Sequence, residues 1–483
     1  MPRLILLAAA IAILFLSVPG GRALAAQDKS IAGNWLGTIA VNGIELRIGL
    51  AFTIKSGGAY SGTFQSLDQG AQTLPLDSVT VNGNSVAFTL KIASGSWSGE
   101  LNTEGTELSG TWSQGASSLP LNFKKQAGAP KTSRWQDPVA PFPYTQVEVL
   151  YPNKTAGFNL GGTLTIPQGK RPFPAVLLIT GSGQQDRNES LLGHRPFLVI
   201  ADYLTRRGIA VLRVDDRGIG KSGGNFAAST TADFVTDVQS GIAFLRSRPE
   251  IDSARIGLAG HSEGGIIAPA VAAADPKIAF IVLLAGTGVN GASLLLAQQE
   301  AIGRAMGTPD QAIAATRASN KALFDIVVAS KDAASSEAAI RKVAEAQAAQ
   351  AKAQGADPAA VDQAVNSAIA TMNSPWMRYF LKYDPAPALQ KVKCPVLALN
   401  GSKDRQVPPQ QNLPAIKAAL TAGGNKDFKV VELEGLNHLF QTCTTGAPSE
   451  YGKIEETFSR NALKVMADWI IAHVISGRNT RTK

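Results

Sequence analysis

Cysteine is scarce in this chain: the 483 residues include only Cys394 and Cys443. Two cysteines exclude a disulfide framework and a multi-cysteine zinc or iron–sulfur site, and we expect no metal centre. We also expect the two not to pair. Cys394 begins a predicted strand and Cys443 lies beyond its far end, so roughly six residues at ~3.3 Å each separate them.

Charge is also sparse. Charged residues make up 17% of the chain and hydrophobic residues 45%, which excludes a disordered, solvating chain. The net charge is +9, but its basic residues are scattered apart from a tail cluster of Arg478, Arg481 and Lys483. Binding phosphate needs basic groups focused on one face, so we interpret the tail as a solvated end and expect no nucleic-acid partner. At about 150 residues per domain, the length suggests roughly three folding units.

The sequence lacks an apolar run long enough for an ordinary membrane span. The run at 4–16 has 13 residues, against the ~20 that a spanning helix needs. It follows Arg3 and precedes the small-residue site Ala23-Leu24-Ala25, which predicts a signal peptide over 1–26, cut after Ala25 or Ala26. An uncleaved anchor is the alternative. We expect an exported protein, periplasmic or extracellular, without a stable membrane anchor.

Residues 27–128 show short alternating stretches separated by turn signals at 42–43, 57–58, 82–83 and 104–105. We expect about eight strands that close into a small all-β barrel or sandwich, because closure removes exposed edges. Tryptophan recurs beside glycine at Trp35, Trp97 and Trp112. No pattern here indicates chemistry, so a scaffold or a wall of the substrate path is expected, with carbohydrate or ligand binding as the alternative.

A proline-rich linker (129–144) precedes a region in which strands alternate with helices. After a predicted strand pair come continuous apolar or β-branched runs, as expected for strands covered on both faces. These runs lie at 176–180, 209–214, 256–259, 278–284, 396–399 and 428–433. The order predicts an α/β fold with a doubly wound, mostly parallel sheet, built from 145–288 and 393–483.

The interval 289–392 is too long for a single crossover helix. It is rich in alanine and glutamine with helical spacing. We therefore predict a helical cap inserted above the strand ends, where sites in such sheets form. A coiled-coil arm is the weaker alternative, because alanine stands where heptads favour leucine or isoleucine.

The residues that indicate chemistry begin with the segment 260–265, Gly-His-Ser-Glu-Gly-Gly, between a predicted strand and a predicted helix. A serine on such a sharp turn needs small residues two positions before and after it, and Gly260 and Gly264 meet that need. Ser262 is the predicted nucleophile. The alternative is a tight turn whose serine caps the helix.

A serine hydroxyl needs a histidine base and a carboxylate that orients it. Of the four histidines, His261 adjoins the serine and should point away, His194 starts a helix and His473 lies in the last helix. This leaves His438, in the loop between the last strand and the last helix.

The acid should lie in the loop after the preceding strand. This position selects Asp404 over Asp384 and Asp427. The alternative is that Asp404 only forms a turn. The order Ser262, Asp404, His438 is that of α/β-hydrolases.

The tetrahedral intermediate needs donors for its oxyanion. One should be the backbone N–H of Glu263, and the other should come from the loop 181–184. We favour Ser182, with Gly183 and Gln184 left open, and expect Gly181, Gly183 and Gln184 to contact substrate. Nucleotide-binding motifs are excluded, because aspartate stands where the third glycine of a dinucleotide fingerprint and the first glycine of a phosphate loop are required.

Five segments in this order resemble the α/β-hydrolase superfamily: 181–187, 215–222, 260–265, 400–404 and 437–438. The chain is most similar to bacterial esterases with an added N-terminal β domain, in a branch akin to prolyl oligopeptidases and serine aminopeptidases. The resemblance covers about 145–475. It implies hydrolysis of a small, short-chain carboxylic ester through an acyl-Ser262 intermediate, without a cofactor. Thr180 departs from the histidine that many relatives carry before the oxyanion glycine.

Other functions stay open. Glu263, Asp186 and Arg187 could line the pocket, and a carboxylate there could hold a free amine, which keeps an aminopeptidase or exopeptidase as the alternative. Equally, these residues could satisfy loop backbone groups. A non-catalytic binding module that uses the β domain is a third hypothesis. The sequence leaves the oligomeric state open.

Overall fold

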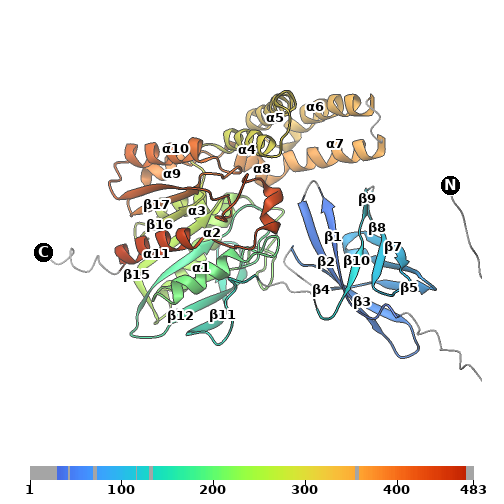
Figure 1. The fold of residues 1–483 in the computed structure, drawn as a ribbon. Helices are drawn as coiled ribbons and strands as arrows, with labels where there is room; N and C mark the ends of the chain where they lie inside the picture. Colours follow the sequence, from blue (N-terminus) through green and yellow to red (C-terminus); the bar gives the residue numbers. More distant parts are fainter. Residues whose placement is uncertain are drawn as a thin grey trace, which may run out of the picture.

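The structure is a computed structural model, which describes residues 30–41, 44–68, 73–115, 117–129, 134–353 and 358–474. The predicted signal peptide and the basic tail cluster lie outside the described residues. Figure 1 shows an all-β part (blue to cyan) beside a larger α/β part, with further helices (yellow to orange) above the latter. None of the helices in the described ranges combines the length and apolar character needed to cross a membrane.

The all-β part is one antiparallel sheet in the order β4-β3-β2-β1-β10-β8-β7-β6-β5, with β9 paired to β8. It curls so that β3 meets β5, which makes a half-barrel. The sequence predicted about eight strands, and the described residues form ten, two of them the short β4 and β9. The strands are β1 (Gly33–Val41), β2 (Ile44–Ile54), β3 (Tyr60–Ser66), β4 (Thr73–Pro75), β5 (Ser78–Asn82), β6 (Ser85–Leu90), β7 (Gly95–Leu101), β8 (Glu107–Gln114), β9 (Ser117–Pro120) and β10 (Phe123–Gln126), with a 3₁₀ turn η1 (Lys91–Ala93).

The recurring tryptophans and glycines of this sheet form its core. Trp97 on β7 pairs with Trp112 on β8, and Phe88 stacks on Trp97 with 5.4 Å between ring centroids. Gly95 leaves room for the indole, since a Cβ at this position would lie 2.1 Å from the Trp112 ring. The buried Trp97 Nε1 donates to the carbonyl oxygen of Leu121 at 2.8 Å. The pattern in the sequence therefore reflects packing.

The α/β part contains an eight-stranded sheet in the order β11-β12-β14-β13-β15-β16-β17-β18. β11, β12 and β14 pair antiparallel, and β14, β13 and the strands beyond it are parallel. This is the predicted doubly wound, mostly parallel sheet, with an antiparallel hairpin at one edge. The strands are β11 (Tyr144–Asn153), β12 (Phe158–Pro167), β13 (Phe173–Ile179), β14 (Ala210–Val214), β15 (Ile251–His261), β16 (Ile281–Leu284), β17 (Val396–Gly401) and β18 (Phe428–Leu433).

Helices cover both faces of this sheet, which explains why its strands are apolar throughout. On β13, Val176 and Leu178 pack with α1 (Pro196–Thr205) and α11 (Arg460–Val474). The alternate residues Leu177 and Ile179 pack on the other face. The helices there are α2 (Thr231–Arg246), α3 (Gly264–Ala274), α9 (Ala386–Lys391) and α10 (Pro409–Ala422).

The interval between β16 and β17 forms the predicted layer of helices above the sheet (Figure 1). Its helices share a separate apolar cluster that includes Phe324, Val327 and Ile340. At the end of the interval, α9 packs on the sheet instead, through Leu389. The helices above the sheet are α4 (Gly291–Ala305), α5 (Asp310–Ala329), α6 (Ala333–Ala353), α7 (Pro358–Asn373) and α8 (Pro375–Lys382).

The all-β part contacts two loops of the α/β part. The buried Asp68 pairs with Arg47 at 2.6 Å, and its backbone carbonyl accepts from Leu192 N at 2.5 Å. Arg134, within the linker, donates to the carbonyl oxygens of Leu192 at 3.2 Å and Gly452 at 2.7 Å. Gly452 belongs to the 3₁₀ helix η2 (Pro448–Lys453). A small apolar cluster spans the same junction: Leu46, Leu191, Leu192, Leu439 and Tyr451.

Candidate active site

Ser262 lies on a sharp turn between β15 and α3. Its φ of 52° is in the left-handed region, which is rare for a serine and marks local strain. Gly260 and Gly264 permit the turn: a Cβ at Gly260 would lie 1.9 Å from the carbonyl oxygen of Gly264, and one at Gly264 would lie 2.3 Å from that of Ile179. The backbone N–H of Ser262 donates to Leu284 O at 2.8 Å, which holds the turn onto the neighbouring strand.

Asp404 and His438 meet at the ends of β17 and β18. His438 Nδ1 lies 2.8 Å from Asp404 Oδ2, and both side chains are buried. The other oxygen, Oδ1, accepts from the backbone N–H groups of Gln406 and Val407, each at 2.8 Å. One carboxylate therefore fixes its own loop and orients the imidazole, so that Nε2 remains for proton transfer.

Ser262 and His438 line one cavity of about 220 Å³ beneath the cap helices. Its lining comes from the turn at Ser262, from the loops after β13, β16, β17 and β18, and from helices α4 and α8. Among the described residues, no hydrogen bond joins the Ser262 hydroxyl to His438. A hydroxyl turns about one bond, and such contacts often form only with substrate bound.

The loop 181–185 supplies part of the wall of this cavity. The backbone N–H of Gly181 donates to Glu189 Oε1 at 2.8 Å and so is occupied. The N–H groups of Ser182 and Glu263, both in residues that line the cavity, donate to no other described residue. Of the residues expected to contact substrate, Gly181 lines the cavity, whereas Gly183 and Gln184 are not among its lining residues. Gln185 lines it instead.

The structure brings a second histidine to the site, which the sequence reasoning missed. His261 was expected to point away from the chemistry. It is buried, with its ring centroid 4.7 Å from that of His438. Its Nδ1 lies 2.9 Å from Glu189 Oε1 and its Nε2 lies 3.0 Å from the backbone oxygen of His438. Glu189 is 72 positions away along the chain, and no motif spacing announces the pair.

Asp186 and Arg187, the other residues considered for the pocket, serve loop structure. Asp186 accepts from the backbone N–H groups of Asn188 and Ser190 at 3.0 and 2.9 Å. Arg187 pairs with the buried Asp215 at 2.6 Å and with Glu148 at 2.7 Å. Neither lines the cavity that contains Ser262.

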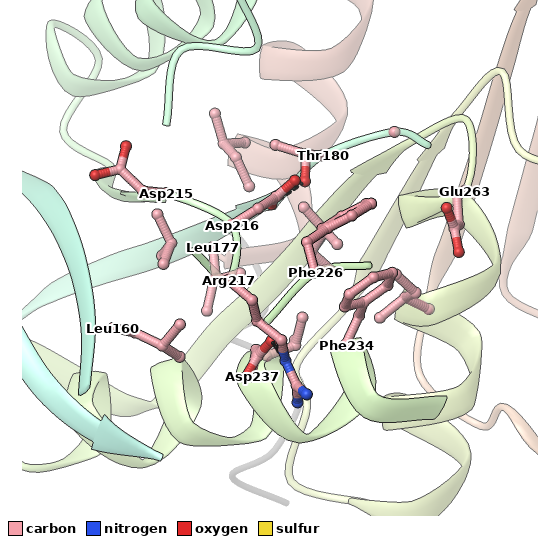
Figure 2. A pocket seen from close by; sticks show the side chains of 16 residues that line it. Leu160, Leu177, Thr180, Asp215, Asp216, Arg217, Phe226, Phe234, Asp237 and Glu263 are labelled. Carbon is pink, nitrogen blue, oxygen red and sulfur yellow. Dashed lines mark hydrogen bonds and ion pairs between the residues drawn. The ribbon is translucent and has the colours of Figure 1, made fainter. Parts of the chain in front are cut away.

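Glu263 does line that cavity, and it also borders a smaller one of about 50 Å³ (Figure 2). Its side chain is buried, and burial raises the pKa of its carboxyl. Asp216, on the opposite side of the smaller cavity, accepts from Thr180 Oγ1 at 2.7 Å and from Gln185 N at 2.9 Å. Burial raises the pKa of Asp216 to about 8.

Within the described ranges, no group of histidine, cysteine and acidic side chains has the arrangement of a metal site. The two cysteines are free thiols.

The match to a known family decides the assignment. Residues 195–442, just over half of the chain, match the family described as serine aminopeptidase, S33. The chain belongs to this family. The predicted resemblance to α/β-hydrolases of the serine-aminopeptidase branch is thereby confirmed, as is the fold class.

Individual proteins that resemble this chain do so at low sequence identity or over only part of their length. Esterase EstD of Thermotoga maritima is 32% identical over 114 residues, which cover 24% of this chain and 27% of that protein. The chain thus matches about a quarter of the length of EstD. An Escherichia coli protein, described as an uncharacterized 31.7 kDa protein in the traX-finO intergenic region, is 26% identical over 270 residues, 55% of this chain and 84% of that one. A solved structure of the Pyrococcus furiosus esterase PF2001 aligns with a TM-score of 0.41 and 14% identity, over 69% of this chain and 92% of that one.

Proposed function

We propose that the protein is a serine carboxylesterase that hydrolyses small, short-chain esters through an acyl-Ser262 intermediate. The observation that carries the proposal is the arrangement around one cavity. A strained serine on a strand-to-helix turn shares it with His438, whose Nδ1 is held by Asp404 at 2.8 Å. Membership of a hydrolase family and the similarity to EstD support the same class of reaction.

Acylation would begin with His438 as the general base. Nε2 takes the proton of the Ser262 hydroxyl while Oγ attacks the ester carbonyl carbon. The negative charge on the former carbonyl oxygen is accepted by the free N–H groups of Ser182 and Glu263. The imidazolium, stabilised by Asp404, then returns the proton to the alkoxy oxygen as the C–O bond breaks, and the alcohol leaves.

Deacylation repeats these steps with water. His438 takes a proton from a water molecule, the hydroxide formed attacks the acyl carbon, and the same N–H groups hold the second oxyanion. The bond to Ser262 Oγ breaks, the serine regains a proton from His438, and the carboxylic acid is released. The cavity of about 220 Å³ has room for a short acyl chain.

Exopeptidase activity on short peptides is the second candidate. The family description names serine aminopeptidase, and a carboxyl group at Glu263 borders the cavity. An ionised carboxylate there would suit the free amine of a peptide terminus.

The decisive experiment compares a chain-length series of p-nitrophenyl esters with aminoacyl p-nitroanilides. We expect the wild-type protein to hydrolyse acetate or butyrate esters and to react with a fluorophosphonate probe, and Ser262→Ala to do neither. Ser247→Ala, which changes an exposed serine outside the cavity lining, is the matched control. Faster cleavage of the anilides than of the esters would favour the exopeptidase, and labelling of Ser262→Ala would refute the assigned nucleophile.

A further inference from the structure

The indole ring of Trp376 is a fixed part of the wall of the cavity that contains Ser262. Its Nε1, on the cap helix α8, donates to Glu263 Oε1 at 2.8 Å. The ring stacks on that of Phe380, one turn further along α8, with 4.8 Å between centroids and 16° between planes. Glu263 is itself held, since it is 2% exposed and its Oε1 also accepts from Thr231 Oγ1 at 2.6 Å. A movement of the indole would therefore break a hydrogen bond to the residue that follows Ser262.

Trp376 and His438 approach Ser262 from opposite sides of the sheet order. Ser262 follows β15, which lies inside the order β14-β13-β15-β16-β17-β18. His438 lies in the loop after β18, on one side. Thr231, to which Trp376 is joined through Glu263, begins α2, the helix that follows β14 on the other side. A carbonyl carbon bound at Ser262 would thus lie between the imidazole and the indole.

This arrangement gives each substituent of the tetrahedral intermediate a direction. One bond goes to Ser262 Oγ. The former carbonyl oxygen faces the N–H groups of Ser182 and Glu263, and the alkoxy oxygen must face His438, which returns a proton to it. The direction that remains leads away from His438, so the acyl chain extends toward Trp376.

Trp376 belongs to an apolar part of the cavity lining. Four side chains of one apolar cluster on helices α4 and α8 contribute to it: Leu294, Leu295, Trp376 and Phe380. Of the described residues that line the cavity, none is lysine or arginine, whereas Glu189 and Glu263 are acidic. A carboxylate at the end of an acyl chain would find no cation here, and its burial would be costly. An alkyl chain gains free energy from the burial of each methylene.

We propose that Trp376 is the specificity-determining residue for the acyl group: the cavity accepts short, uncharged alkyl chains, and the indole ends the space available to them. This inference rests on the proposed ester hydrolysis and deepens it, because it names the residue that limits the chain length. Since the indole is bonded to the residue next to Ser262, a chain meets it within a few carbons of the carbonyl. The alcohol group, on the side of His438, is not limited by Trp376.

The test measures kcat/KM for p-nitrophenyl acetate, butyrate, hexanoate and octanoate. We expect wild type to prefer acetate and butyrate, and Trp376→Ala to raise the octanoate-to-butyrate ratio by at least about tenfold. Trp376→Phe, which keeps a ring but loses the hydrogen bond to Glu263, should give a ratio between the two. Tyr379→Ala is the matched control, since Tyr379 is on the same helix but does not line the cavity, and it should keep the wild-type ratio. An unchanged ratio in Trp376→Ala would overturn the proposal.

A second series varies the alcohol of butyrate esters from ethyl to octyl. Wild type and Trp376→Ala should depend on the alcohol in the same way, and a change confined to this series would place Trp376 on the wrong side of the substrate and refute the proposal. If Trp376→Ala does not fold, Leu295→Phe decides, because it adds bulk to the same lining and should lower the butyrate-to-acetate ratio. An unaltered ratio there would contradict the proposal.

Failure of this proposal can be told apart from failure of the proposed function. If wild type hydrolyses no ester of either series and equals Ser262→Ala, the esterase assignment itself fails. If wild type hydrolyses the short esters, Ser262→Ala does not, and Trp376→Ala has the chain-length profile of wild type, only the role of Trp376 is refuted.

Discussion

His261 Nε2 lies 3.0 Å from the backbone carbonyl oxygen of His438, so the turn that carries Ser262 is tied directly to the loop that carries His438. A carbonyl oxygen only accepts, so Nε2 must carry a hydrogen. Nδ1 faces the Glu189 carboxyl at 2.9 Å, and this carboxylate raises the pKa of His261 against the effect of burial. His261 as an imidazolium can donate at both nitrogens. Since Glu189 also accepts from Gly181 N, one ion pair joins three loops of the site.

His261→Gln should therefore lower kcat through misplacement of His438 and leave KM nearly unchanged. A displacement of about 1 Å at reacting groups can cost roughly 10²-fold in rate, and we expect a loss of that order. Steady-state kinetics on p-nitrophenyl butyrate measures it. His473→Gln is the matched control, because among the described residues that histidine bonds to Trp469 O and Asp427, neither of which lines the cavity. Equal activity of the two variants would show that the tie is dispensable.

Asp404→Asn should reduce kcat by roughly 10⁴-fold while the fold persists. The asparagine can still accept the two loop N–H groups through Oδ1. At the other position, its amide nitrogen would face His438 Nδ1 and favour the tautomer that leaves Nε2 unable to accept the serine proton. The pre-steady-state acylation rate is the measurement. Asp427→Asn, at an exposed carboxylate that also bonds a histidine, should remain near wild type.

Asp216, which lines the smaller cavity, should make stability depend on pH. Its folded pKa of about 8 lies above the ordinary value of 3.8, so the folded state binds more protons between these values. The free energy of unfolding must then fall as pH rises from about 4 to 8. Denaturant titrations at several pH values should show this decline, and the slope should be shallower in Asp216→Asn. An identical slope in both proteins would mean that Asp216 is ionised in the folded state.

The junction of the two parts should depend on Asp68. Its carboxylate accepts from the backbone and side chain of Arg47 and is almost fully buried. Asp68→Ala should reduce the free energy of unfolding by about 1–3 kcal/mol, since buried donors lose their partner. Glu107→Ala, which removes an exposed ion pair with Lys124, should change it by less than about 1 kcal/mol. Chemical denaturation measures both, and equal effects would contradict a structural role for Asp68.

The residues predicted around Ser262, Asp404 and His438 are those whose local chain geometry requires a recognisable pattern of residues in the sequence. Any Cβ at Gly260 or Gly264 would make a contact of 1.9 or 2.3 Å, so the turn requires glycine at both positions. This requirement can be recognised in the sequence. The alternation of strand and helix likewise predicted the parallel sheet. Both signals arise from constraints within a few residues.

No comparable sequence pattern indicated that Glu189 and Trp376 would reach the site. Each reaches the site through contacts that span long stretches of chain, 72 positions to His261 and 113 positions to Glu263. Only the packing of the loop after β13 and of the cap onto the sheet creates them. For the same reason, the sequence could list Glu263 as a pocket residue but could not tell that a tryptophan of the cap would donate to its carboxyl.

Leu46 of the half-barrel shares an apolar cluster with Leu439, the residue after His438, so the N-terminal sheet packs against the loop that carries His438. Removing the half-barrel would therefore take away packing beside the loop that carries His438 and expose the apolar side chains of Leu191, Leu192 and Leu439. Any minimal version, or any chimera with a foreign core, would have to carry the segment 189–194 and its half-barrel counterpart as one unit.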